Sequence, residues 1–291
     1  MNFNYTHFKV PEDASVNLEK YSTNESGGFD KKSAKVEIKS NIKELKEIQR
    51  VFYADDRFSL LIILQASDTA GKDGVIRHVM SGINPQGCRV HSFKTPSKEE
   101  LDHDYLWRHY KVLPERGMIE IFNRSHYENV LVTKVNPQFI LNENIPGIDS
   151  VDKIDDEFWQ NRYEQINNFE KHLSKNGTHI LKFFLHVSKE EQKKRLLSRL
   201  DNPDKNWKFN SADLHARAQW NEYQQAYTEM LENTSKDYAP WYVIPADKKH
   251  FARVAVGNII LEKLQSLNLR YPSGESENIL VKAREQLLAE E

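Results

Sequence analysis

The sequence predicts an α/β protein of three layers, in which helices cover both faces of a five-stranded parallel sheet. Short apolar stretches alternate along the chain with longer segments that have helical periodicity. The first stretch, SLLIILQ at 59–65, is almost wholly apolar, as is typical of a strand buried on both faces. The strand–helix order then repeats, and this order favours parallel strands joined by crossovers.

The individual elements follow from the same patterns. Residues 1 to about 33 are polar, and we expect an extended arm that wraps around the body or frays. Strands are expected at 59–65, 88–93, 117–125, 178–187 and 241–245. Helices are expected at 40–54, from about 72, and at 98–113, 126–134, 154–175, 188–200, 215–234, 248–267 and 277–290. Ser97 and Ser188 are expected as N-caps, and Glu191 completes a capping box with Ser188.

This order divides the chain into an arm (1–40), a central domain (41–270) and a C-terminal helix (271–291). The polar, irregular segment 201–214 lies within a predicted helical lid at about 195–220. We expect it over the carboxyl edge of the sheet, where ligands bind in such folds. The tail helix has a row of apolar residues that suggests a partner-facing surface: Ile279, Leu280, Ala283, Leu287 and Leu288.

Composition narrows the class of protein. The 291 residues include 41 basic and 43 acidic side chains, and a net charge of −2 argues against a dedicated nucleic-acid binder. The one cysteine, Cys88, excludes an internal disulfide and favours a reducing compartment. Neither a secretory signal nor a run of about 18 apolar residues is apparent, so we expect a cytoplasmic protein without a membrane span.

The stretch LQASDTAGKDG, residues 64–74, has the context of a phosphate-binding loop (P-loop), with a strand before it and a helix after it. In such a loop, backbone N–H groups surround an anion at a helix N-terminus, and a lysine adds positive charge. We therefore expect phosphate contacts from Lys72 and from Ala70, Gly71, Asp73 and Gly74.

Two positions depart from the pattern G-x-x-x-x-G-K-[ST]. Ala66 replaces the first glycine, which is tolerable if this position needs no positive φ. Asp73 replaces the hydroxyl residue that reaches Mg²⁺, and Asp68 is the natural substitute, since carboxylates suit a hard cation. The alternative is a turn that is merely rich in small residues.

The motif FNRSHYE, residues 122–128, follows the third predicted strand. In P-loop enzymes such a strand ends in a carboxylate near Mg²⁺, and here Asn123 offers a neutral oxygen. Arg124 would bind the transferring phosphate through its planar guanidinium. The alternative is a helix start capped by Asn123 or Ser125, with Arg124 in solvent.

Basic residues gather around the irregular segment. Arg199, Lys205 and Lys208 occupy the place of the lid in nucleotide kinases, where arginines stabilise the transferring phosphoryl group. Further candidates for an anion-lined groove are Lys94, Arg108 and Arg253. Runs such as Lys193–Lys194 are more simply a solvated helix face.

Together these segments resemble the family-2 polyphosphate kinases, from about Phe52 to Leu264. The resemblance is carried by LQASDTAGKDG, FNRSHYE, RLDNPDKNWKFNSADL, QWNEYQQAY and APWYVIPADKKHFARV. It implies a P-loop kinase-like fold with a helical lid, Mg²⁺-dependent and reversible phosphoryl transfer between polyphosphate and purine nucleotides, and a homo-oligomer, either dimer or tetramer.

By position, the resemblance implies roles for individual residues. Asp68 would be the metal carboxylate, and Asp68, Lys72, Asn123, Arg124 and Arg199 would be catalytic. Lys94, Lys205, Lys208 and Arg253 would contact phosphates. FNRS followed by Glu128 resembles the subgroup that accepts AMP or GMP as well as ADP or GDP.

Two other functions remain open at this point. An ATP-dependent nucleoside monophosphate kinase of the thymidylate kinase type would share the loop, the lid and the strand order. It would keep Ser or Thr where this chain has Asp73. A non-catalytic sensor would bind polyphosphate or nucleotide without forming ATP.

Overall fold

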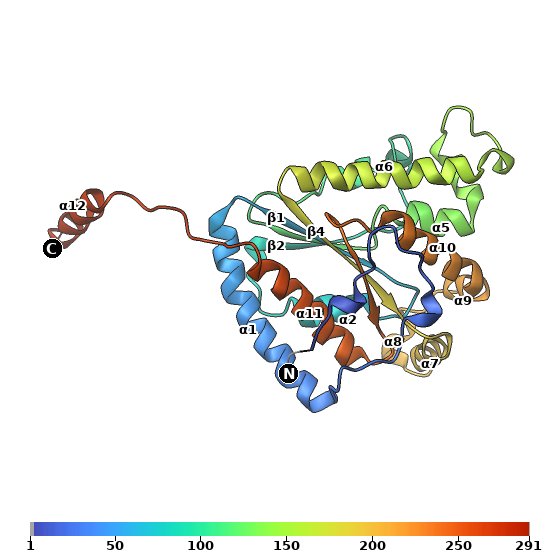
Figure 1. Cartoon of the computed structure of the whole chain (residues 1–291), viewed down its shortest axis with the longest axis horizontal. Helices are drawn as coiled ribbons and strands as arrows, with labels where there is room; N and C mark the ends of the chain where they lie inside the picture. Colours follow the sequence, from blue (N-terminus) through green and yellow to red (C-terminus); the bar gives the residue numbers. More distant parts are fainter. Residues whose placement is uncertain (1–2, 291) are drawn as a thin grey trace.

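A computed structural model describes residues 3–290 and shows a single parallel sheet between two layers of helices (Figure 1). The sheet has five strands in the order β2-β3-β1-β4-β5, and every neighbouring pair is parallel. The strands are β1 (Ser59–Gln65), β2 (Cys88–Ser92), β3 (Ile119–Asn123), β4 (Thr178–His186) and β5 (Trp241–Pro245). The predicted fold class is confirmed.

Helices connect successive strands and account for most of the remaining ordered chain. Short 3-10 turns, such as Pro137–Glu143, join some of them. The α-helices are α1 (Lys31–Asp55), α2 (Lys72–Val79), α3 (Lys98–Leu101), α4 (Trp107–Tyr110), α5 (Glu128–Val135), α6 (Asp156–Lys175), α7 (Lys189–Leu200), α8 (Pro203–Asn206), α9 (Ala212–Ala218), α10 (Trp220–Thr234), α11 (Lys249–Gln265) and α12 (Glu277–Leu288).

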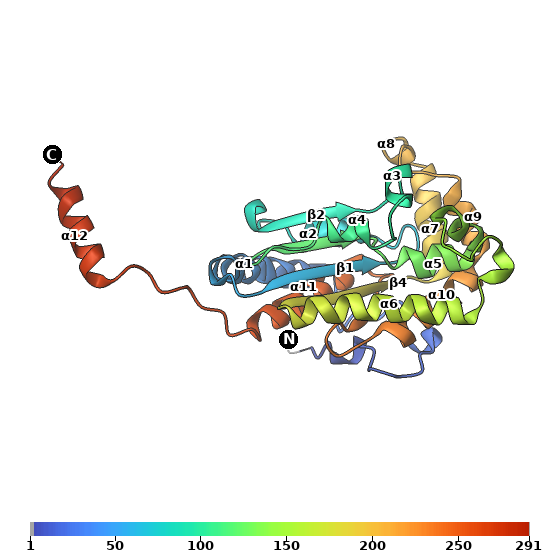
Figure 2. The same ribbon diagram turned by 90° about the horizontal axis from the view of Figure 1, so that it is seen from above.

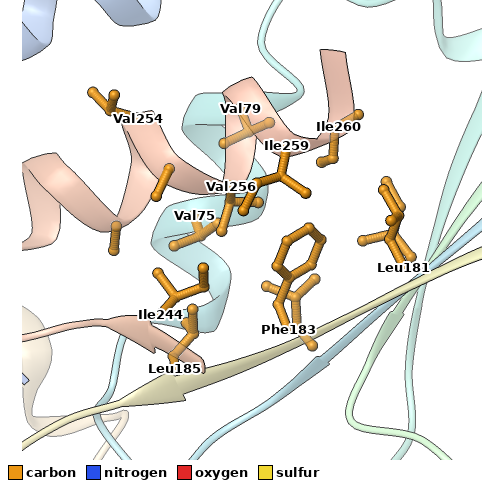
Figure 3. Close-up of a cluster of buried hydrophobic side chains, with 14 of the residues drawn as sticks. Val75, Val79, Leu181, Phe183, Leu185, Ile244, Val254, Val256, Ile259 and Ile260 are labelled. Atoms are coloured by element: carbon orange, nitrogen blue, oxygen red, sulfur yellow. The ribbon is translucent and has the colours of Figure 1, made fainter. Parts of the chain in front are cut away.

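One face of the sheet is covered by α1, α2 and α11. Because side chains alternate along a strand, Leu60, Ile62 and Leu64 of β1 point to this face. Figure 3 shows α2 and α11 packed on β4 and β5. The residues in contact there include Val75, Val79, Val256, Ile259, Leu181, Phe183, Leu185 and Ile244. This packing fixes α2, and with it the end of the loop that precedes α2.

The opposite face is covered by α5, α6 and α10. Leu61 and Ile63, the alternate residues of β1, belong to this second apolar cluster. It also contains Val130 of α5, Ile166 of α6 and Met230 of α10, all fully buried. The two faces of the sheet therefore carry helices that bring different side chains to the same edge.

The N-terminal arm wraps rather than frays over its described part. Lys9 forms an antiparallel bridge with Tyr242 of β5, and the Val10 N–H donates to the Trp241 carbonyl at 2.9 Å. Phe8 and Val10 are buried. The helix that follows begins at Lys31 rather than at residue 40, because Asp30 and Ser33 form a capping box there. The first two residues of the arm and residue 291 lie outside the described residues.

Two local predictions were wrong. The single helix expected at 98–113 is two short helices, α3 and α4, because the Asp104 side chain accepts from the Leu106 N–H at 2.9 Å and competes with helical bonding. Ser188 caps α7, but Glu191 does not complete a capping box by accepting from the Ser188 N–H. The Glu191 carboxylate accepts from Arg195 at 2.8 Å, and the Ser188 N–H donates to Asp247 at 2.8 Å.

The remaining elements lie at opposite ends of the molecule. Figure 2 shows α7, α8 and α9 gathered at the end of the sheet to which β1 points. The segment expected to be irregular, 201–214, includes α8 and the start of α9. The tail helix α12 stands away from the body (Figure 1) and has no buried residue. Among the helices of residues 3–290, none has the length and apolar character needed to cross a membrane.

Candidate active site

The loop between β1 and α2 has the backbone that phosphate binding requires. Gly71 caps α2 with a φ of 111°, a conformation that favours glycine. Ala66, which replaces the usual first glycine, is not among the residues with positive φ, so a Cβ is accommodated at this position. Asp73 and Gly74 lie in the first turn of α2, where free N–H groups point toward the loop.

Lys72 lies across this loop. Its Nζ donates to the Ala66 carbonyl at 2.9 Å. Burial lowers the pKa of Lys72, and the nearby charge of Arg124 lowers it further, while Asp68 and Glu128 oppose the shift. The expected phosphate lysine and the expected phosphate arginine therefore share one site.

Arg124 is held in an unusual backbone conformation at the end of β3. Its φ is 64°, and its N–H donates to the Leu64 carbonyl at the end of β1 at 3.1 Å. The guanidinium donates to Asp68 Oδ1, also at 3.1 Å, and so links the end of β3 to the loop. Burial opposes its charge, but Glu128 and Asp68 raise the pKa of Arg124 above its ordinary value. The Arg124 side chain is partly exposed, and its guanidinium is paired with Asp68.

Asn123 joins the same edge. Its Nδ2 donates to Asp73 Oδ1 at 2.8 Å. Asp73, which replaces the usual hydroxyl residue in α2, and Asn123, which replaces the usual carboxylate at the end of β3, therefore contact each other. An aspartate at position 123 would place two carboxylates within hydrogen-bonding distance.

Glu128 begins α5 on the other side of Arg124. Gln65 is the buried last residue of β1, and with its amide oxygen and nitrogen exchanged it donates to Glu128 Oε1 at 2.9 Å and accepts from the Ser125 N–H at 3.2 Å. Burial raises the pKa of Glu128, and Arg124 and Lys72 oppose that shift. Sequence reasoning missed Gln65, although a polar residue at the end of an apolar strand was a usable signal.

A cavity of about 340 Å³ opens beside Arg124 and Glu128. Lys94 and Arg108, both expected in an anion-lined groove, are among its lining residues. The Arg108 guanidinium lies over the Phe93 ring, 5.1 Å from its centroid, and its Nε is 3.4 Å from Glu100 Oε1. The cavity therefore combines an aromatic face with positive charge. Its lining also includes Tyr105, His109, Ser125, Asn129, Thr133 and Glu143.

The lid brings a carboxylate as well as an arginine. Arg199 donates to Asp213 Oδ2 at 2.8 Å and to the Lys208 carbonyl at 3.0 Å, which ties α7 to α9. The Lys208 ammonium lies 4.9 Å from the ring centroid of Trp207, an exposed residue. Burial and then the charge of Asp68 raise the pKa of Asp213, while Arg199 opposes the shift. Asp213 was missed because its segment was expected to be irregular.

A second group of cations lies on the other face of the sheet. A Cβ on Gly74 would lie 3.6 Å from the guanidinium of Arg253 in α11. Lys249, one helical turn earlier, has its pKa lowered by burial and then by Arg195, Arg253 and Lys205. Sequence reasoning missed Lys249, although its position four residues before Arg253 in a predicted helix places both on one helical face. Lys205 of the lid does not line the cavity, and its charge contributes to the lowered pKa of Lys249.

Arg195 of α7 stabilises the P-loop by donating to its backbone carbonyls, a role that was not predicted from the sequence. Its guanidinium donates to the carbonyls of Thr69 and Ala70 at 3.2 and 2.7 Å. It also donates to the carbonyls of Ala246 and Asp247 after β5 at 2.6 and 2.9 Å. These contacts join the P-loop to the end of β5.

Asp68 is a carboxylate of this site that could bind a cation. Its carboxylate is partly exposed, and its charge contributes to the raised pKa of Asp213 in the lid. Within residues 3–290, no cluster of three or more His, Cys, Asp or Glu is arranged to hold a metal ion. This donor set fits Mg²⁺, which keeps several waters and binds through one or two carboxylates together with substrate phosphates.

Comparison with known proteins agrees with this geometry. The family model described as Polyphosphate kinase 2 (PPK2) matches residues 28–272. The chain is 46% identical over 291 residues to a protein of Rhodopseudomonas palustris named ADP-polyphosphate phosphotransferase, covering 99% of this chain and 100% of that protein. It is 42% identical to the AMP/ADP-polyphosphate phosphotransferase of Meiothermus ruber, covering 94% and 98%.

A solved structure is similar over nearly the whole chain. The crystal structure of polyphosphate kinase 2 from Arthrobacter aurescens TC1 superimposes with a TM-score of 0.85 at 36% sequence identity. The match covers 97% of this chain and 98% of that one. The P-loop, the paired Asp68 and Arg124, and these similarities lead to one conclusion: the chain belongs to the polyphosphate kinase 2 family.

Proposed function

We propose that this protein is a phosphotransferase that moves a phosphoryl group from inorganic polyphosphate to AMP or ADP, or to the corresponding guanine nucleotides. One observation carries the proposal. Lys94 and Arg108 line the cavity beside Arg124, Arg253 lies near Gly74 in the first turn of α2, and Lys72 lies on the P-loop itself. Such an arrangement suits two polyanions that must meet end to end.

The cavity beside Arg124 suits the acceptor nucleotide. Phe93 offers a ring for a purine base, and Arg108 and Lys94 offer charge for its phosphates. Glu128 lies where it can fix a water or a hydrated cation beyond the phosphate of a short acceptor. We therefore assign Glu128 to the use of AMP in addition to ADP.

The cationic group on α11 suits the donor. Arg253 lies near the first turn of α2, outside the acceptor cavity, and the charge of Lys205 in the lid contributes to the lowered pKa of Lys249. A linear polyanion with one charge on each phosphate matches a row of this kind better than a compact nucleotide does. Arg199 and Lys208 belong to the lid that would close over the junction.

The transfer needs no strong base. A phosphate oxygen of the nucleotide attacks the terminal phosphorus of polyphosphate, and the anhydride bond from that phosphorus to its bridging oxygen breaks. The shortened polyphosphate leaves with the bridging oxygen. The attacking oxygen is already anionic at neutral pH. Lys72 and Arg124 align the two chains and balance the charge on the transferring group. The same geometry serves the reverse reaction.

Asp68, whose charge contributes to the raised pKa of Asp213, would hold Mg²⁺ beside the phosphates. The ion would supply further neutralisation of the phosphate charge. In this proposal Asn123 contributes a neutral contact to Asp73 where a charged ligand is more usual.

The test is to incubate purified protein with polyphosphate, Mg²⁺ and either AMP or ADP, and to follow the nucleotides by chromatography. ATP formed from ADP only when polyphosphate is present supports the proposal. Phosphorylation of AMP by ATP without polyphosphate would instead identify an ATP-dependent monophosphate kinase. Binding of both ligands with no product would identify a sensor. The homo-oligomeric state and the cytoplasmic location stay predictions.

A further inference from the structure

A fully buried ion pair lies behind the segment that carries Arg124 and Glu128. Lys182 of β4 and Glu170 of α6 are both inaccessible to solvent, and Lys182 Nζ lies 2.6 Å from Glu170 Oε2. Neither residue touches the P-loop or lines the cavity. The proposed transfer chemistry leaves this pair unexplained.

The pair is connected to the motif FNRSHYE. Lys182 donates to the Tyr127 hydroxyl and to the Thr234 carbonyl, each at 2.7 Å. With Glu170, these contacts use all three protons of the ammonium group. Glu170 Oε1 in turn accepts from the Tyr127 hydroxyl at 2.8 Å and lies 3.4 Å from His126 Nε2. Two consecutive residues of the motif are thus attached to one buried charge pair.

Stability alone does not account for such a pair. Burial lowers the pKa of Lys182 to about 8, which reflects the cost of removing its charge from water. Replacing a buried ion pair with apolar residues is often neutral or stabilising. The contacts of the pair with its neighbours, rather than its own stability, therefore indicate its role.

The segment that it holds is strained and lies next to the reaction site. Arg124 has a φ of 64°, which costs free energy for a residue with a Cβ and persists only where neighbouring contacts fix it. In front, its N–H is bound to the Leu64 carbonyl at 3.1 Å. Behind, the chain is fixed at His126 and Tyr127, and Glu128 follows directly.

We infer that Lys182 and Glu170 are positioning residues that act through Tyr127 to fix Arg124 and Glu128 in the acceptor site. The inference rests on the proposed phosphoryl transfer. It makes a distinction between the two substrates, because the cations assigned to polyphosphate lie on α11 and the lid, and not on this segment. Arg124 also contacts the transferring phosphate, so loss of the pair weakens acceptor binding and turnover strongly and polyphosphate binding less.

The test variant is Lys182→Met with Glu170→Leu, which removes both charges together. The matched control is Ser59→Ala with Thr178→Val. It removes a buried 2.9 Å hydrogen bond between the first residues of β1 and β4, at the end of these strands away from the P-loop. For the test variant we expect a fall in kcat of about 10–100-fold, the range typical of lost supporting contacts around a site. We expect weaker ADP binding by titration calorimetry and a smaller change in the KM for polyphosphate than in the affinity for ADP. The control should keep its kcat and its ADP affinity.

Tyr127→Phe provides the second measurement, because it deletes the connecting hydroxyl and leaves the ion pair in place. We expect it to lower kcat in the parent and to have no further effect in the Lys182→Met/Glu170→Leu background. Parental kcat and ADP affinity in the folded double variant would overturn the inference, as would an equal loss in the control. If the double variant does not fold, a Tyr127→Phe protein with the parental kcat and ADP affinity is enough to overturn the inference. A parent protein that forms no ATP refutes the proposed function instead, and calorimetry with ADP then still tests the positioning.

Discussion

Asn123 Nδ2 donates a 2.8 Å hydrogen bond to Asp73 Oδ1, which joins the end of β3 to the first turn of α2. The contact depends on the neutral amide, because a carboxylate at position 123 would repel Asp73. The Asn123→Asp protein should therefore lose about 1 kcal/mol of unfolding free energy without Mg²⁺, the size of a partly solvated charge repulsion. Millimolar Mg²⁺ should restore its melting temperature.

The matched control for this charge effect is Asn123→Ala, which removes the same hydrogen bond without adding a carboxylate. Its melting temperature should fall slightly and should gain from Mg²⁺ no more than the parent does. Melting curves recorded by circular dichroism at two Mg²⁺ concentrations distinguish the two variants. If Asn123→Asp is as stable as the parent without Mg²⁺, charge repulsion at this edge is not the reason for the asparagine.

Glu128 should determine how well AMP serves as acceptor. Replacing it with asparagine removes the charge that faces Arg124 and Lys72, and the shorter acceptor depends more on this side chain. We expect Glu128→Asn to lower kcat/KM for AMP by about tenfold more than for ADP, the effect of one lost charged contact. Glu99→Gln, an exposed acid outside the cavity, is the control. Equal losses for AMP and ADP would refute the assignment.

Arg195 should be the residue on which the loop conformation depends most. Its guanidinium bonds to four backbone carbonyls, and a shorter polar side chain leaves several of them without a donor. Arg195→Gln should lower the unfolding free energy by roughly 2–4 kcal/mol, the cost of several unsatisfied buried groups. Urea denaturation measures this loss, and Lys193→Gln on the exposed side of α7 should leave the midpoint unchanged. An equally small change for both would contradict the supporting role.

His179 should make the protein less stable in acid. Burial at the start of β4 lowers the pKa of His179 to about 4. Between about pH 6.5 and 4, the unfolded chain binds a proton at this residue that the folded chain does not, so this residue's contribution to stability falls as the pH falls. The His179→Gln protein should therefore lose less unfolding free energy than the parent between pH 7 and 5. Parallel losses in urea titrations at the two pH values would contradict this.

The sequence predicted the sheet and the central site because both depend on local patterns. The apolar run 59–65 and the Gly71-Lys72 pair specify a buried strand, a loop and a helix start within one short segment. Parallel connectivity then brings Arg124 to the same edge as Asp68, since both follow the carboxyl ends of strands. The strand order and the positions of these two residues were enough to predict that Arg124 and Asp68 lie close together.

What could not be predicted depends on contacts between distant segments. Arg195 resembles any basic residue on a solvated helix until the fold brings the carbonyls of the P-loop and of β5 to it. Lys182 lies in an apolar strand, and nothing local pairs it with Glu170, since that pairing requires α6 to pack on β4. Asp213 was hidden in a segment whose helix could not be inferred from its polar composition.

The most direct measurement compares the parent protein with Lys72→Ala in a solution of ADP, polyphosphate and Mg²⁺. Lys72 adds a full positive charge to the P-loop, and its removal should cost about 10²–10³-fold in the rate of ATP formation while the melting temperature stays near the parental value. A parent that forms ATP only with polyphosphate, and a folded variant that almost fails to do so, is the predicted result. A folded Lys72→Ala protein that makes ATP at the parental rate would contradict the assignment of this loop to phosphoryl transfer.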